Sequence, residues 1–243
     1  MSIANDNTET QENINKISAW TAENKMLLNR KKSNLMIFNF TTDYQFSSRI
    51  EMEGEIMGFA RETKLLGVLV NDRLNWDNNT VSLVRRANAR MRLLHKLVQF
   101  NVPREDLLNI YVLYVRSILE QSCQVWHSSL TLENFQDLER VQKNALRIIL
   151  QEDYMSYSHA LNMTGLSTLF VRRELLCLRF AKSCLKNKHM KSIFPLNDAT
   201  SLINTRFREV FKVTKSRTER LKNSAVQYMQ RLLNSAVSKK TKK

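Results

Sequence analysis

Residues that could bind a catalytic metal are spread thinly along this sequence. The four histidines, which stand far apart in the chain, are His95, His127, His159 and His189. A catalytic zinc site needs several ligands that converge. Cys123 and His127 could share one face of a helix, but no nearby residue completes such a site. We therefore expect these two to be core residues, and we expect no metal or cofactor in this chain.

The cysteines favour a reducing compartment. They are odd in number and widely spaced, at Cys123, Cys177 and Cys184. This pattern is typical of buried free thiols in an intracellular protein. Residues 1–13 are polar and acidic rather than apolar, unlike a signal peptide. No apolar run reaches the roughly 18 residues of a membrane span, so we expect a soluble protein of the nucleus or cytoplasm, without membrane contact.

The sequence lacks the usual motifs for phosphate binding and for phosphoryl transfer. Four isolated glycines form neither a P-loop nor a dinucleotide-binding fingerprint. Two-metal catalysis needs converging carboxylates, and adjacent acids occur only at Glu105-Asp106 and Glu152-Asp153. The first pair opens a predicted helix, where acids favour the helix dipole, and the second follows a helix end. A Ser–His–Asp catalytic triad is still possible by spacing, although no nucleophile elbow is present. We expect the protein to bind rather than to catalyse, and we expect no small-molecule substrate.

The positive charge is concentrated in the last third of the chain. Residues 1–170 contain 19 Lys+Arg and 19 Asp+Glu, whereas residues 171–243 contain 19 and 4, so the net charge of +15 lies wholly in the second stretch. Arg172 and Arg173 lie at the start of residues 171–243. Such asymmetry favours binding of a polyanion, RNA or DNA, through its phosphates. The alternative is a solvated basic tail that contacts nothing specific.

The elements that would position these residues are mostly helices, because only four glycines and two prolines interrupt the chain. Up to residue 76 we predict one helix and three short strands. The helix covers residues 11–24, and the strands cover 35–38, 50–53 (turning at Gly54) and 65–70, the last as one continuous apolar strand.

Beyond residue 76 the apolar spacing is helical throughout. Val84, Ala87, Met91, Leu94 and Val98 mark the first helical face. The further predicted helices cover residues 103–120, 132–150, 171–185 and 224–237. The fold class is therefore α+β, mainly α.

Short segments over roughly residues 14–234 follow one another in a characteristic order. They are residues 17–20, 24–29, 32–33, 36–38, 64–68 with Asp72, Leu74 and Trp76, 114–120 with Val125 and Trp126, 138–149, 217–220 and 232–234. Together they resemble the palm end and thumb of non-LTR (LINE/jockey-like) retrotransposon reverse transcriptases.

The resemblance implies a division of the chain. A small palm-like piece with short antiparallel strands would precede a helical thumb-like array and a basic tail. The implied segments are a disordered N-terminus at 1–13, the end of the reverse-transcriptase palm at 14–76, thumb-like helices at 77–152, a basic helical extension at 153–237 and a disordered Lys-rich tail at 238–243.

The resemblance also implies nucleic-acid contacts. Lys32 matches a loop lysine near the incoming nucleotide, and Leu66 and Gly67 match a hairpin that supports the primer end. The first thumb helix, which grips the template–primer duplex by its phosphates, is matched by Arg85, Arg86, Arg90 and Arg92. Arg172 and Arg173 are added as basic residues of the last third. The alternatives are an exposed loop lysine, a glycine needed for packing and a solvated helix face.

The family's catalytic aspartates lie before the first matched motif, so the resemblance assigns no catalytic or metal-binding role to any residue of this chain. It implies Mg²⁺ as a cofactor only for full-length members of the family. The resemblance implies a truncated fragment of an RNA-directed DNA polymerase, with nonspecific RNA or DNA binding as its residual role. One alternative is a domesticated helical module that binds a protein partner. Another is a polymerase subunit assembled with a separately made palm.

Overall fold

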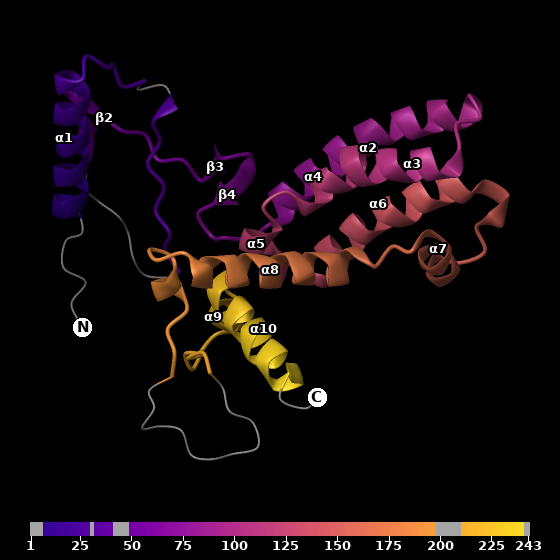
Figure 1. Ribbon diagram of the computed structural model, residues 1–243. Coiled ribbons are helices and arrows are strands. Elements are labelled where there is room, and N and C mark those ends of the chain that lie inside the picture. The colour runs from indigo at the N-terminus through magenta and orange to yellow at the C-terminus, as the bar shows by residue number, and fades with distance from the viewer. Residues whose placement is uncertain (1–6, 30–31, 41–48, 198–209, 241–243) are drawn as a thin grey trace. The chain divides into compact units, whose positions relative to one another are not determined.

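The structure, a computed structural model, describes residues 7–29, 32–40, 49–197 and 210–240 (Figure 1). It is about 63% helical, with two small antiparallel sheets of two strands each, which confirms the predicted mainly α class. The chain divides into an N-terminal unit, Met1–Asn75, and a helical unit, Trp76–Lys243. The helical unit includes both the region predicted as thumb-like and the basic extension that follows it.

The N-terminal unit joins one helix to a hairpin. Helix α1 (Asn7–Glu23) is followed by the hairpin of β1 (Glu51–Met52) and β2 (Glu55–Ile56). The side-chain amide of Gln11 donates to the carbonyl of Glu51 (2.7 Å) and accepts from its N–H (2.9 Å), which fixes the helix to the strand. Because α1 starts at Asn7, the prediction that residues 1–13 are disordered is wrong for 7–13; residues 1–6 lie outside the described chain.

Both hairpins turn through two residues with positive φ. In the first, Glu53 has φ 53° and Gly54 has φ 81°, as the predicted turn at Gly54 requires. In the second, Leu66 (φ 48°) and Gly67 (φ 87°) separate β3 (Glu62–Leu65) from β4 (Val68–Asn71). Two-residue turns of this sign match the twist of the flanking strands. The prediction of one continuous strand over 65–70 is therefore wrong, because Gly67 accepts the positive φ that reverses the chain.

The predicted strand at 35–38 is also wrong. Leu35 forms only an isolated parallel bridge with Phe59. Phe38 is exposed, while Leu35 to Ile37 are half-buried. An apolar run alone does not make a strand, because a strand needs a neighbour that satisfies its backbone groups.

The helical unit is an array of helices. Most of them follow one another through short turns, whereas residues 194–218 separate the last helices of the unit from the preceding ones in the sequence. Its elements are α2 (Asp77–Gln99), α3 (Arg104–Ile110), the π-helix η2 (Tyr111–Arg116), α4 (Ser117–Glu120), α5 (Cys123–Trp126), η3 (His127–Ser129), α6 (Leu132–Leu150), η4 (Gln151–Asp153), α7 (Tyr157–Thr164), α8 (Leu169–Lys186), η5 (Lys191–Ile193), α9 (Glu219–Lys222) and α10 (Ala225–Lys240). Figure 1 shows α2 and α6 lying, in this view, on either side of the continuous rod formed by α3, η2 and α4, and α8 packs against α5, α6 and α10.

The predicted helices are confirmed with small changes at their ends. Helix α6 has the predicted bounds, and the side chain of Thr131 caps it by accepting from the N–H of Asn134 (3.2 Å). The helix expected over 103–120 is interrupted by η2. Helix α10 runs to Lys240, so the prediction of a disordered tail is wrong for residues 238–240; residues 241–243 lie outside the described chain.

Two apolar layers hold the helical unit together. Helices α2 and α6 bury one face each, which includes Ala87, Leu94 and Leu138. A second cluster joins α8 to α10 through residues such as Cys177 and Met229. All three cysteines are buried and free, as predicted. Within the described ranges, no helix is both long and apolar enough to cross a membrane.

Candidate nucleic-acid interface

A groove between α2 and α6 is lined by cationic and amide side chains. Its volume is about 420 Å³. The two helices run in the same direction, since Asn134 near the start of α6 donates to Asp77 at the start of α2 (2.6 Å). Each helix therefore offers one stripe of side chains at a spacing of three or four residues. The lining residues are Asn88, Met91, Arg92, His95, Asn144, Arg147 and Ile148.

Two guanidinium groups in this groove have no anionic partner within the described part of the chain. Neither Arg92 nor Arg147 forms an ion pair with a carboxylate of the described residues, and the residues that line the groove include no acid. The Arg147 guanidinium lies 5.2 Å from the ring centre of Tyr154, which restricts its position. Arg85 is exposed on the stripe of α2 that continues through Asn88 and Arg92. The groove can therefore bind phosphate oxygens through charge-assisted hydrogen bonds.

The four arginines expected to form one phosphate-binding face of α2 separate into two pairs. Arg85 and Arg92 are exposed, whereas Arg86 and Arg90 are half-buried. Arg86 donates to the side chain of Gln121 (3.1 Å). Arg90 donates to the backbone carbonyl of Tyr114 (3.0 Å), and its guanidinium lies 4.0 Å from the centre of the Tyr114 ring. Arg86 and Arg90 thus connect α2 to the segment from η2 to α4, and we leave them out of the phosphate-binding set.

The two arginines at the start of the basic third are also held internally. Arg172 makes two contacts with the carboxylate of Glu120 (3.1 and 3.4 Å), which Arg116 approaches at 3.0 Å. Arg173 is 0% exposed. The expectation that Arg173 contacts phosphates is therefore corrected, since a fully buried side chain cannot reach a bound polyanion without rearrangement of α8.

Lys32, Leu66 and Gly67 belong to the N-terminal unit, whereas the groove belongs wholly to the helical unit. Lys32 is exposed, and its backbone N–H donates to the carbonyl of Asn29 (3.0 Å). Leu66 is 90% exposed at the tip of the β3–β4 turn, beside Gly67. The structure thus places Leu66 and Gly67 in a hairpin, the arrangement that the family resemblance implied.

A buried polar network surrounds Gln142 of α6. Gln142 accepts from the hydroxyl of Tyr111 (2.8 Å) and donates to the hydroxyl of Tyr157 (2.8 Å) and the carbonyl of Ser167 (3.0 Å). Tyr157 in turn donates to Glu139. Burial raises the pKa of the Tyr111 and Tyr157 hydroxyls, so both stay protonated and serve as donors. This network joins α6 to η2, α7 and the turn that precedes α8, and it has a structural role.

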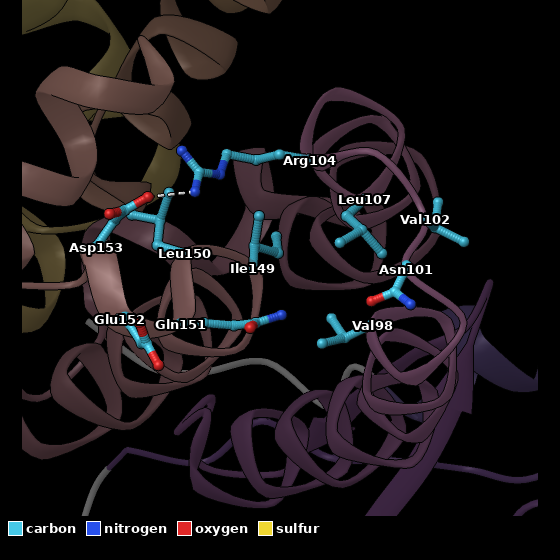
Figure 2. Close-up of a pocket in the computed structure, with 10 residues that line it drawn as sticks. All are labelled: Val98, Asn101, Val102, Arg104, Leu107, Ile149, Leu150, Gln151, Glu152 and Asp153. Atoms are coloured by element: carbon cyan, nitrogen blue, oxygen red, sulfur yellow. Dashed lines mark hydrogen bonds and ion pairs between the residues drawn. The ribbon is translucent and has the colours of Figure 1, made fainter.

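A second hollow, of about 370 Å³, lies at the ends of α2 and α6 (Figure 2). Arg104 points across it toward Asp153 and forms an ion pair with that carboxylate. The Glu105-Asp106 pair occupies the first turn of α3, as predicted. No group of three metal-ligating side chains occurs among the residues that the structure describes. Asp153 neutralises Arg104, and Glu105 and Asp106 offset the positive end of α3. This hollow is therefore less suited to an anion than the α2–α6 groove.

The sequence pattern did not point to His95, Asn144 or Arg147. The signal that could have found Arg147 is the stripe of α6 that it shares with Asn144, but the relevance of this stripe depends on α2 lying beside it. No protein-family model, no curated protein and no solved structure matches the chain.

Proposed function

We propose that this protein binds RNA or DNA without sequence preference, through phosphates that lie along the α2–α6 groove. The observation that carries the proposal is the pair of guanidinium groups, Arg92 and Arg147, which have no acidic partner among the described residues. The surplus of +15 supports it, because a basic protein attracts a polyanion over a long range. The motif resemblance to a reverse-transcriptase thumb, which grips a duplex by its backbone, points the same way.

The groove supplies binding rather than catalysis. It contains no hydroxyl or thiol nucleophile among its lining residues, and His95 is the only imidazole among them. We accordingly propose that a chain of this origin does not extend primers by itself. Primer extension with Mg²⁺ tests this point directly, and synthesis of DNA by the purified protein would contradict it.

The binding proposal is tested by the salt dependence of affinity. Each phosphate contact contributes about 0.9 to the slope of log K against log salt concentration on a duplex. We expect Arg92→Gln combined with Arg147→Gln to lower the slope on an RNA–DNA hybrid by about 1.8. Fluorescence anisotropy with a labelled hybrid, at several salt concentrations, measures this change.

A matched control removes the same charge from another helix. Arg179 and Lys182 are exposed on α8, so Arg179→Gln combined with Lys182→Gln changes the net charge equally. This control should leave the slope nearly unchanged. Equal slopes for the two double variants would show diffuse attraction in place of a groove, and the absence of any binding would overturn the proposed function.

A second candidate function is binding of a protein partner by the helical unit. It is supported by large apolar side chains that α2, η2 and α6 expose, of which Leu113 is 75% and Leu132 is 72% exposed. A protein-binding module should retain its partner at high salt. Binding of the hybrid that is weak and insensitive to salt would therefore favour this candidate over the groove.

A further inference from the structure

An aromatic hollow lies beside the starts of α6 and α8 and shares no residue with the α2–α6 groove. Its volume is about 420 Å³, which exceeds that of a single side chain or base. Helix α10 contributes one wall. The residues that line it are His127, Ser128, Leu130, Thr131, Leu132, Phe135, Phe170 and Tyr228.

The hollow contains a buried donor that has no partner in the described part of the chain. His127 is only 5% exposed, and its Nδ1 accepts a hydrogen bond from Nε of Arg173 (3.4 Å). An arginine nitrogen only donates, so Nδ1 carries the lone pair and the neutral ring carries its proton on Nε2. Burial, together with the charge of Arg173, lowers the pKa of His127 to about 3, so the ring stays neutral. Nε2 has no hydrogen-bond partner among the described residues.

The position of the ring leaves this donor for a ligand. Nδ1 is turned toward Arg173, which does not line the hollow, whereas His127 does line it; Nε2 therefore lies on the edge of the imidazole away from Arg173. A buried N–H without an acceptor is costly. The oxygen of Ser128, which also lines the hollow, has no partner among the described residues either. A ligand that offers acceptor atoms would satisfy both groups.

The walls of the hollow are suited to a flat ring. The ring of Phe170 lies 5.1 Å from that of His127 and 5.5 Å from that of Phe135, and Tyr228 meets His127 edge-on at 5.8 Å. Phe170 is 41% exposed, so part of its surface is not covered by these neighbours. Aromatic surfaces of this kind stack with planar groups.

The chemistry of the hollow distinguishes between two kinds of planar occupant. A tryptophan side chain has a donor but no acceptor, and phenylalanine has neither, so neither of them would pair with Nε2 of His127. Every nucleobase, in contrast, combines a flat face with ring nitrogens or carbonyl oxygens that accept hydrogen bonds.

The charge around the hollow favours the same occupant. The hydroxyl of Ser129 donates to the carbonyl of Asn223 (2.8 Å), which fixes the end of α9 next to η3. Residues 210–222, which lead into this point, include one acid, Glu219, and five cations: Lys212, Lys215, Arg217, Arg220 and Lys222. A phosphate linked to a base in the hollow would therefore meet a positive segment.

We propose that the aromatic hollow binds one unpaired nucleobase of single-stranded RNA or DNA, with Nε2 of His127 donating to an acceptor of the base and Phe170 packing on its face. The inference rests on the proposed function, which supplies the strand, and it adds a preference for strands with unpaired bases. The base contact and the phosphate contact involve different residues and can be removed separately.

The first experiment compares a single-stranded oligonucleotide with one of equal length whose central positions are abasic. Anisotropy should show that the full chain binds the base-containing strand roughly tenfold more tightly. Phe170→Leu, which keeps an apolar side chain but removes the ring, should abolish this ratio. The groove variant Arg92→Gln with Arg147→Gln should weaken both strands equally and keep the ratio, and thermal melting checks that each variant folds.

The second experiment does not depend on phosphates. Adenosine is added to protein labelled with ¹⁵N-histidine, and the His127 Nε2 resonance is expected to shift, while N-acetyltryptophanamide leaves it in place. A shift with adenosine when no strand binds would sustain the base site and reject the proposed function. Equal binding of both strands, without a shift, would reject the base site alone. A shift with the tryptophan analogue only would show that the hollow accepts a protein side chain and would overturn the inference.

Discussion

Acid is expected to destabilise the helical unit through His127. The ring has an ordinary pKa of 6.5 in the unfolded chain, whereas burial, and then the charge of Arg173, lower it to about 3 in the folded protein. Between these values the unfolded chain binds a proton at this residue and the folded chain does not. The stability that depends on His127 is therefore complete above pH 6.5 and is lost progressively as the pH falls toward 3.

The size of the effect follows from the width of this window. Each pH unit below 6.5 costs about 1.4 kcal/mol of unfolding free energy until the folded ring itself takes up a proton. At pH 4.5, two units below the ordinary value, the loss is about 2.7 kcal/mol. This is a large share of the ~5–15 kcal/mol that separates a folded domain from its unfolded chain.

Urea unfolding followed by circular dichroism, at pH 7.5 and pH 4.5, measures this loss. His127→Gln is the matched variant, because its amide oxygen can accept from Arg173 but does not titrate. Between the two pH values, the wild-type protein should lose about 2.7 kcal/mol more than the variant. The carboxylates are the same in both proteins, so their contributions cancel in the difference. Equal losses would refute the reasoning, as would an NMR titration that places the pKa of His127 near 6.5.

Three further predictions concern stability. Gln142→Met should lower the free energy of unfolding, measured by chemical denaturation, by about 2–4 kcal/mol, because the buried Tyr111 hydroxyl and Ser167 carbonyl lose their partner. Adding Tyr111→Phe should recover part of this loss. Full additivity of the two substitutions would argue against the hydrogen bond. Gly67→Ala forces φ 87° on an alanine and should speed hydrogen exchange in β3 and β4 several-fold while the helical unit keeps its protection; unchanged exchange would contradict a strained turn. Thr131→Ala should destabilise α6 by about 1 kcal/mol, whereas Thr131→Asn should not, and equal melting of the two variants would exclude the cap.

Much of the helical fold follows from local sequence signals. Helix α6 has its apolar stripe, its capping residue Thr131, an acid in its first turn and Arg147 in its last turn, so pattern and capping agree on its bounds. The β3–β4 hairpin is the opposite case. Leu66 and Gly67 lie inside an apolar run that reads as one strand, and only the positive φ values at both positions show the reversal. A two-residue turn with leucine at its first position leaves little trace in the sequence.

The candidate site was predicted less well, because its residues depend on partners far along the chain. Arg86 and Arg90 have the spacing of a solvated helix face, yet Gln121 and Tyr114 hold them half-buried against the segment from η2 to α4. Arg173 carries a charge that predicts exposure, yet α8 places it fully inside. Burial of an arginine is uncommon enough that sequence reasoning predicts the opposite. The groove itself requires the parallel packing of α2 on α6, which no local signal provides.

The π-helix η2 has a consequence for how the gene can change. A π-helix carries more residues per turn than an α-helix, so Tyr111–Arg116 holds surplus chain within one continuous element. Deletion of a single codon in this stretch would be absorbed by return to α-helical winding, without shortening a loop. Tyr114, whose carbonyl accepts from Arg90, would then face a different neighbour. We therefore expect one-residue length variants of the protein to be tolerated at this position and to differ mainly in the attachment of α2.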